Sequence, residues 1–398
     1  MNPEHTTNAG IHTLTWPDYQ IGMRVDRIRE SREHLTAEVF IKTTLPGVNT
    51  HLTQARHNLT SITARNSLTR MLEDRLPGLP WGEIVEQGFV TVINHYREGA
   101  PLIRLGDLPP QERVAYRVKP LIVEKQANLL YGSGGTLKSY LAQYMSVLVE
   151  SPLDHNGLET EPGKILYLDY ETDEHEVAER IRMLQAGLDI LSPTDVLYRY
   201  GHQTLADDIE NIQRLTMEND VHMVIVDSIG SACGGEPESA DVVLRYFNAL
   251  RSLRMTTLSI DHANKEGQLF GSVYKFNSAR SVFETRKTQE PGDGHLTVGL
   301  YHRKMNGSGL IKPLAFKFSF LPDMVTVTKA DPGAEPDLRK GLSGPQQMIA
   351  ILRRGARTTK ELAEELETSE GAIRTFVSRL DQVVRLNDGR VGLVSNQS

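Results

Sequence analysis

The sequence predicts an α/β fold in which a mainly parallel sheet carries helices, with a small α+β module before it and a winged, three-helix module after it. Three observations lead to this prediction. A glycine-rich loop near residue 132 joins an apolar strand-like segment to an apolar helix-like segment. Strand-like and helix-like segments then alternate, which is typical of parallel sheets. Proline- and glycine-rich segments, residues 99–120 and 331–344, indicate linkers on either side of this central part.

The N-terminal module with its linker is expected to span residues 1–120. Apolar and polar side chains alternate over residues 19–28 and 35–42, with a polar turn between them, which predicts a β-hairpin. Residues 58–76 and 81–97 have the periodicity of amphipathic helices. No catalytic constellation is evident here, so we expect an accessory or oligomerisation module.

The glycine-rich loop has the features of a P-loop. Residues 127–131 form the strand-like segment before it, and Lys138 begins the helix after it. Loop N–H groups and the helix N-terminus direct partial positive charge at phosphate oxygens. Lys138 would neutralise the β- and γ-phosphates, and the Ser139 hydroxyl would bind Mg²⁺. We therefore expect ATP and Mg²⁺ as cofactors, held by Gly132, Ser133, Gly134, Gly135, Thr136, Leu137, Lys138 and Ser139.

The loop departs from the motif G-x-x-x-x-G-K-[ST] at one position. Leu137 stands where a glycine is expected before the lysine. Glycine eases close approach of the backbone to phosphates, and leucine is tolerable only if its φ and ψ stay in an allowed region. An ordinary glycine-rich turn before a helix is the alternative, but the strand and helix on either side favour the P-loop.

The central domain is expected to span residues 121–330. Its strand-like segments after the P-loop are residues 165–170, 196–200, 223–226 and 256–260. Its helix-like segments are residues 174–187, 207–218 and 240–254. Ligands of parallel sheets bind beyond the carboxyl ends of the strands, so polar residues at those ends are the candidates for a site.

Two carboxylates follow such strands. Asp227 comes after four apolar residues, where a Walker B carboxylate would hold Mg²⁺ directly or through water. Glu171 closes another strand and is placed to polarise an attacking water. The alternatives are a strand-end aspartate that caps a turn and a solvated glutamate. Asp169, two residues before Glu171, is expected to face inward or to support a ligand.

Together these segments resemble a RecA-like P-loop ATPase, and most of all the RepA-type hexameric replicative helicases, which are AAA-domain ATPases of phages and mobile elements. The resemblance covers roughly residues 125–320 and is carried by GSGGTLKSYLA (132–142), ILYLDYE (165–171), MVIVDS (223–228) and SIDHANK (259–265). In that family the catalytic glutamate ends the strand after the P-loop helix, which implies Glu171. Ser228, beside the Walker B aspartate, agrees with this pattern.

The resemblance also implies a sensor and a mobile loop that contacts nucleic acid. His262 and Asn264 match the polar sensor by position, with a structural histidine as the alternative. The mobile loop corresponds to residues 267–280, where basic and aromatic side chains suit a single strand and its bases. A packed structural loop is the alternative. The expected nucleic-acid contacts in this loop are Lys275, Asn277 and Arg280.

A late strand, residues 295–304, is expected to pair with residues 315–320. In RecA-like oligomers basic residues of this strand reach the ATP of a neighbouring subunit, so the resemblance implies Arg303 or Lys304 as a finger acting in trans. A finger of this kind requires a homo-oligomer, which in this family is a hexameric ring. Exposed strand charges are the alternative. The expected catalytic residues are Lys138, Glu171, His262, Arg303 and Lys304.

Residues 345–398 predict a winged helix-turn-helix. Three helices are expected, followed by two short strands around the turn at residues 387–390. Arg374 and Arg379 on the third helix would contact DNA. However, residues 341–398 contain eight basic and seven acidic side chains, and this balance weakens the case for DNA because phosphate neutralisation supplies much of the affinity. Docking to a protein is the alternative.

The amino-acid composition narrows the possible classes of protein further. The 398 residues carry a net charge of −7, which excludes a wholly basic nucleic-acid coat but not a local basic channel. Cys233 is the single cysteine, so an intramolecular disulfide is excluded and a reducing compartment is favoured. No apolar run approaches the roughly 18 residues that a membrane span needs. We expect a cytoplasmic protein that does not contact a membrane.

Three functions agree with these features. The first is an oligomeric, Mg²⁺-dependent ATPase that translocates on or unwinds single-stranded nucleic acid, most simply DNA, in replication or repair. The second is a non-motor RecA-like ATPase that acts as a switch in DNA loading, recombination or regulation. The third is a scaffold that binds nucleotide without turnover, and the presence of Glu171 argues against it.

Overall fold

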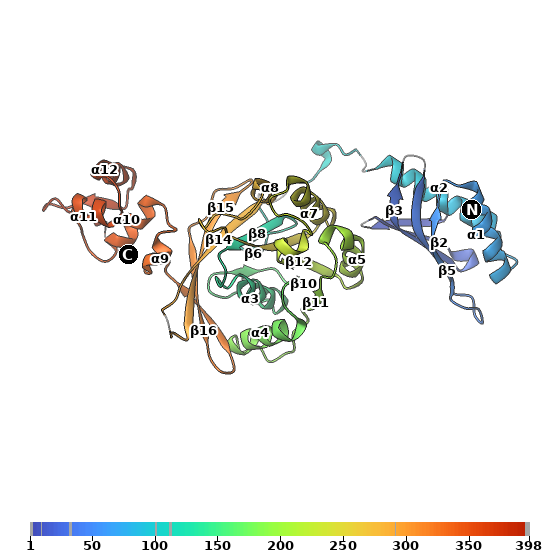
Figure 1. The fold of residues 1–398 in the computed structure, drawn as a ribbon, viewed down its shortest axis with the longest axis horizontal. Helices are drawn as coiled ribbons and strands as arrows, with labels where there is room; N and C mark the ends of the chain where they lie inside the picture. Colours follow the sequence, from blue (N-terminus) through green and yellow to red (C-terminus); the bar gives the residue numbers. More distant parts are fainter. Residues whose placement is uncertain are drawn as a thin grey trace. The chain divides into compact units, whose positions relative to one another are not determined.

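The computed structural model describes residues 3–8, 10–31, 34–99, 102–110, 114–290 and 292–394 (Figure 1). The chain divides into two compact units. The first comprises residues 1–111 and 208–218, and the second comprises residues 112–207 and 219–398. Among the described residues, no helix combines the length and the apolarity that crossing a bilayer requires.

The first unit contains a five-stranded antiparallel sheet whose strands follow chain order: β1 (Glu4–Asn8), β2 (Ile11–Trp16), β3 (Ile21–Glu30), β4 (Leu35–Thr43) and β5 (His51–Asn58). The predicted hairpin is the β3–β4 pair. Two helices follow, α1 (Ile62–Arg75) and α2 (Trp81–Glu98), close to the predicted ranges. Alternate strand residues share one core with both helices, and this core includes Trp16 and Trp81.

A nine-stranded sheet organises the second unit, in the order β11-β10-β12-β13-β8-β14-β15-β16-β17. Neighbours from β11 to β14 pair in parallel, and β14 to β17 pair antiparallel. The strands are β8 (Ala127–Gly132), β10 (Lys164–Asp169), β11 (Leu197–Tyr200), β12 (Val221–Asp227), β13 (Thr256–His262), β14 (Ser281–Thr288), β15 (His295–Met305), β16 (Leu314–Phe320) and β17 (Val325–Ala330). This confirms the predicted α/β fold with a mainly parallel sheet.

Helices cover both faces of this sheet (Figure 1). They include α3 (Lys138–Glu150), α4 (Glu174–Gly187), α6 (Ile229–Ala232), α7 (Ala240–Ser252) and α8 (Val273–Ser278). A further helix, α5 (Leu205–Glu218), consists mostly of residues 208–218, which belong to the first unit. Leu258 and Ile260 of β13 join the core under α3 and α4. Between them Ser259 faces the other side, where its hydroxyl lies 2.7 Å from the Tyr246 hydroxyl of α7. The strands are buried on both faces, as parallel strands usually are.

A small three-stranded sheet precedes and supports the P-loop strand. Its strands are β6 (Tyr116–Lys119), β7 (Ile122–Val123) and β9 (Glu159–Thr160), in the order β7-β6-β9. Residues 116–119, expected in the linker, are therefore part of the folded second unit. The side-chain amide of Asn128 on β8 donates to the Val123 carbonyl at 3.0 Å, and this bond connects the two sheets.

The C-terminal part contains three helices and a hairpin, in the predicted order. They are α10 (Gly344–Leu352), α11 (Thr359–Glu365), α12 (Glu370–Arg379), β18 (Val383–Arg385) and β19 (Val391–Leu393), with a small core of their own. The segment expected to be a linker contains a short helix, α9 (Pro336–Arg339). Leu338 of α9 is buried, and its carbonyl accepts a hydrogen bond from the Tyr301 hydroxyl. This segment therefore contacts the large sheet.

Candidate active site

Four neighbouring parallel strands end beside one another and define the candidate site. β8 ends at Gly132, opposite His262 of β13. β10 and β12 end at Asp169 and Asp227, which also lie opposite each other. The P-loop, the Walker B position, the sensor position and the turn that carries Glu171 therefore meet at one edge of the sheet, as the carboxyl ends of parallel strands do.

Close packing at the P-loop requires glycine at its first position. A Cβ on Gly132 would lie 2.0 Å from the Thr285 hydroxyl and 2.6 Å from the Thr285 carbonyl oxygen. The Thr136 hydroxyl donates to the Ser133 carbonyl at 2.8 Å and lies 2.8 Å from the Thr285 hydroxyl. Gly135 has a φ of +69°. These contacts hold the loop against β14.

Leu137 takes up the left-handed conformation, with φ 54° and ψ 30°. This backbone region is allowed but costs a non-glycine residue about 1–2 kcal/mol. The side chain packs against the main core of the second unit. Leu137 is the N-cap of α3 and offers no side-chain acceptor to the N–H groups of the first turn. Those donors suit an anion at the start of the helix.

Lys138 lies inside the loop. Its Nζ donates to the carbonyls of Gly132 and Ser133, at 3.0 Å each, and the side chain is buried. Burial lowers the pKa of Lys138, while the carboxylates of Asp227 and Glu171 oppose this shift. The ammonium thus lies where phosphate groups held by the loop would meet it.

Asp227 is a buried carboxylate among hydroxyl donors. The Tyr167 hydroxyl donates to its Oδ2 at 2.7 Å. Burial raises the pKa of Asp227, and hydrogen bonds from Ser139 and Tyr167 act against the rise. A carboxylate beside the Ser139 hydroxyl offers the oxygen ligands that Mg²⁺ prefers. The residues present therefore fit the expected cation.

Glu171 extends from the turn after β10. Its Oε1 accepts a hydrogen bond from the Ser228 hydroxyl and lies 3.4 Å from Nε2 of His262. The contact with His262 is the main cause that lowers the pKa of Glu171, and the side chain is 36% exposed. An ionised, accessible carboxylate thus lies beside the P-loop.

Asp169 shapes the turn that carries Glu171. Its carboxylate is buried and accepts the backbone N–H groups of Glu171 at 2.9 Å and Thr172 at 3.1 Å. The Tyr198 hydroxyl also donates to it, at 3.3 Å. Asp169 faces inward, one of the two roles expected for it.

Sequence reasoning missed β14, which forms one wall of the site. A cavity of about 380 Å³ lies between the P-loop and this strand, lined among others by Thr285, Arg286 and Lys287. The Lys287 ammonium is close to the loop, because a Cβ on Gly135 would lie 3.1 Å from its Nζ. Residues 281–288 show no polar and apolar alternation, and the only local signal was their content of strand-forming residues such as Val282, Phe283 and Thr285.

The structure places Lys275 differently from the expectation that it contacts nucleic acid. Residues 273–278 form α8, and Lys275 of this helix is fully buried. Its Nζ lies 2.7 Å from the carboxylate of Asp261, which is buried as well. The ammonium neutralises a buried charge and is not accessible to a strand. Asn277 and Arg280 are exposed at the opposite edge of the sheet.

Arg303 and Lys304 both contact their own chain. Nε of Arg303 donates to Glu284 at 2.7 Å, and its guanidinium also donates to the Gly341 carbonyl at 3.2 Å. Nζ of Lys304 donates to the carbonyls at the end of α8, those of Phe276, Asn277 and Ala279. Neither cation is free in this structure to act in trans.

Of the remaining candidates, Asn264 follows β13 at the same edge, whereas Arg374 and Arg379 lie on α12 of the C-terminal part. Asn264 forms a tight turn, in which its side-chain oxygen accepts the N–H of Gln268 at 2.8 Å. Arg374 and Arg379 are exposed on α12, and Arg374 pairs with Glu370 at 3.1 Å.

A comparison with models of protein families agrees with this geometry. A family model described as the AAA domain matches residues 101–268. The match and the fold support a RecA-like P-loop ATPase. The matched segment contains the P-loop, Glu171, Asp227 and His262.

Among solved structures, the chain is similar to a KaiC-like protein from the hyperthermophilic archaeon Pyrococcus horikoshii OT3. The two are 16% identical, the alignment covers 53% of this chain and 93% of that chain, and the TM-score is 0.39. No curated protein matches the chain.

Proposed function

We propose that this protein hydrolyses ATP with Glu171 as the residue that orients and polarises the attacking water. The observation that carries the proposal is the position of this ionised carboxylate, held by Ser228 and His262 at the same edge as Lys138 and Asp227. Water positioning by such a carboxylate supplies roughly 10²–10⁴-fold in rate. A scaffold without turnover would have no use for this arrangement.

The other residues bind and position the nucleotide. Loop N–H groups and the Lys138 ammonium would hold the β- and γ-phosphates. A bound Mg²⁺, held by Ser139 and Asp227, would neutralise charge on the phosphate oxygens. His262 keeps the Glu171 carboxylate oriented, so it is a positioning residue.

Steady-state hydrolysis and nucleotide binding test this proposal together. Glu171→Gln should lower turnover at least about 100-fold and preserve nucleotide affinity, because the amide cannot act as a base. Lys138→Ala should weaken nucleotide binding itself. Glu174→Gln, which alters an exposed carboxylate at the start of α4, is the matched control. Full turnover in Glu171→Gln would disprove the role of this residue.

We propose further that the ATPase acts on single-stranded nucleic acid, most simply as a DNA helicase or translocase. Exposed Asn277 and Arg280, together with Arg374 and Arg379 on α12, support this choice. Turnover should rise when single-stranded DNA is added, and a tailed duplex should be unwound. Stimulation without unwinding would favour the switch, the second candidate. Arg303 and Lys304 contact their own chain. This conformation suits the resting state of a switch, because neither cation reaches the nucleotide of a neighbouring subunit.

A ring assembly belongs to the same proposal. Arg303 would have to exchange Glu284 and Gly341 for the nucleotide of a neighbouring subunit. Arg303→Ala should then lower turnover without loss of nucleotide binding. Mixing it with Lys138→Ala subunits should restore part of the activity, because one subunit supplies the intact P-loop and the other the intact finger. Full activity of an isolated monomer would contradict the ring.

A further inference from the structure

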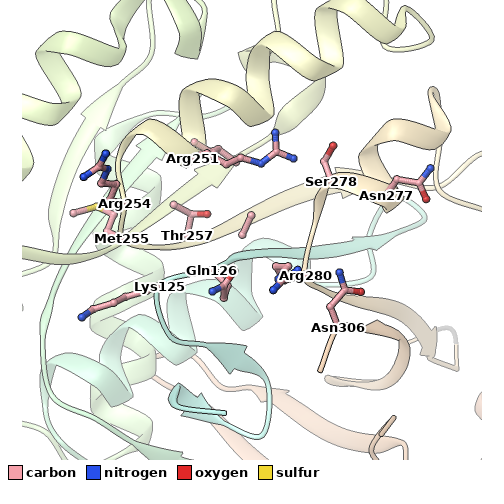
Figure 2. A pocket seen from close by; sticks show the side chains of 12 residues that line it. Lys125, Gln126, Arg251, Arg254, Met255, Thr257, Asn277, Ser278, Arg280 and Asn306 are labelled. Carbon is pink, nitrogen blue, oxygen red and sulfur yellow. The ribbon is translucent and has the colours of Figure 1, made fainter. Parts of the chain in front are cut away.

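A second cavity lies at the amino end of the parallel strands, away from the P-loop edge. Its volume is about 330 Å³. Figure 2 shows side chains from several segments around it: Lys125 and Gln126 before β8, Arg251 and Arg254 at and after the end of α7, and Arg280 before β14. None of these residues except Arg280 was singled out by its sequence pattern.

The lining is strongly positive. Among the described residues that line the cavity, Lys125, Arg251, Arg254 and Arg280 are cations and none is acidic. Within the described part of the chain, no carboxylate forms an ion pair with any of the four. The Arg251 guanidinium donates only to a neutral amide, that of Asn248, at 2.8 Å. Four uncompensated cations in one hollow contrast with the net charge of −7 of the whole chain and favour an anion there.

Backbone hydrogen bonds hold the segments that carry these cations. The Arg280 N–H donates to the Ala127 carbonyl at 2.8 Å, and the Arg280 carbonyl accepts the N–H of Asn306 at 3.0 Å. The Lys125 N–H donates to the Thr256 hydroxyl at 2.9 Å. The negative end of the α7 dipole favours Arg251 and Arg254, but Lys125 and Arg280 come from other segments. The cluster is therefore more than a helix end.

We infer that this cavity binds phosphate groups of a single nucleic-acid strand. Guanidinium groups match phosphate oxygens in pairs. The amides of Gln126, Asn277 and Asn306 also line the cavity and suit phosphate and sugar oxygens. A free polyphosphate would bind through the same contacts. The choice of a nucleic-acid strand as the ligand therefore rests on the proposed function.

An exposed aromatic side chain favours a strand over a free phosphate. α8, which contributes Asn277 and Ser278 to the cavity, also carries Tyr274, whose side chain is 41% exposed. This helix has six residues and is about 9 Å long. A base of a bound strand can therefore reach Tyr274 while its phosphate lies among the cations, and stacking on an aromatic ring holds bases of any sequence.

Binding of a fluorescently labelled oligothymidylate to the full-length protein, measured by anisotropy without ATP over a range of salt concentrations, tests the inference. Arg251→Ala combined with Arg254→Ala should weaken binding about 10-fold and reduce the slope of log K against log salt by about 1.4, the value for two lost contacts. Tyr274→Ala should weaken binding without changing that slope. Arg182→Ala combined with Lys312→Ala, which removes two exposed cations outside the cavity, is the control and should change neither.

Inorganic pyrophosphate is the second probe. Two results together would show that pyrophosphate is the true ligand: it binds the wild type more tightly than the double arginine variant, and oligothymidylate binds both equally. In that case the cavity holds a free phosphate and the inference is overturned. Equal loss in the cavity and control variants overturns it as well. ATP turnover without DNA, measured on the same variants, separates the two proposals. Strand binding that depends on the cavity, without turnover, would disprove only the ATPase activity. Turnover without strand binding would disprove only this binding site.

Discussion

At Leu137 the backbone conformation favours glycine, whereas the packing of the side chain favours a large apolar residue. The P-loop needs a left-handed backbone where the chain turns into α3, a conformation that glycine adopts at no steric cost. The leucine side chain, however, packs against the core of the second unit. Burial of apolar surface offsets the backbone strain, which explains how the loop keeps its shape without the usual glycine.

Substitution at Leu137 can separate these two effects. Leu137→Ala removes the packing and keeps the strained backbone, whereas Leu137→Gly removes both. We expect the glycine variant to be more stable than the alanine variant by about 1 kcal/mol in urea unfolding. At Glu179, an exposed position inside α4, the order should be reversed because alanine is the better helix former. The same order at both positions would rule out strain at Leu137.

At the level of elements, α8 is held in place by charged side chains of neighbouring strands. Lys275 is buried against Asp261 of β13, and Lys304 of β15 donates to the carbonyls at its C-terminal end. Ser272 accepts the N–H of Tyr274 at 3.3 Å at the other end. A segment that resembles a mobile loop in sequence is thus fastened to two strands.

Removing one partner of the buried pair should destabilise the second unit strongly. Lys275→Met leaves the Asp261 carboxylate unpaired, and we expect a loss of about 3–5 kcal/mol in unfolding free energy, followed by circular dichroism. Adding Asp261→Asn should recover a large part of this loss. Lys265→Met, at an exposed lysine of the same segment, should have little effect. Purely additive losses in the double variant would refute the pairing.

At the scale of the whole molecule, the first unit contains features that allow it to be followed alone. Both tryptophans of the chain, Trp16 and Trp81, are buried in its core. His12 is buried there beside two other histidines, with ring centroids 5.3 Å from His5 and 5.1 Å from His95. Burial, and then the charges of His5 and His95, lower the pKa of His12 to about 4.

Acid should therefore destabilise the first unit. The unfolded state takes up a proton on His12 near pH 6.5, and the folded state does so only near pH 4. The contribution of neutral His12 to the free energy of unfolding is therefore fully present above pH 6.5 and is lost as the pH falls toward 4. We expect a loss of about 2–3 kcal/mol from this group, measured by tryptophan fluorescence in urea. His12→Phe should flatten the dependence, and His51→Phe, at an exposed histidine, should not. A pH-independent wild type would contradict the assignment.

Prediction from sequence succeeded where the signal is local. The P-loop, the strand before Asp227 and the hairpin of β3 and β4 each show their pattern within a few residues. It was less complete where partners are distant in the chain. β14 follows a polar segment and was missed, although Thr285 supports the loop. The positions of Lys275 and Lys304 depend on Asp261 and on carbonyls of α8, which no periodicity reveals.

The sequence by itself determined the α/β class and the glycine-rich P-loop between β8 and α3, because strand, glycine and helix signals act through neighbouring residues. Tertiary structure alone decided which charges are available. It buried Lys275 against Asp261, it bound Arg303 and Lys304 to their own chain, and it gathered Lys125, Arg251, Arg254 and Arg280 around one cavity. The physical reason is that the accessibility of a charge depends on the segments packed around it, and these come from all parts of the chain.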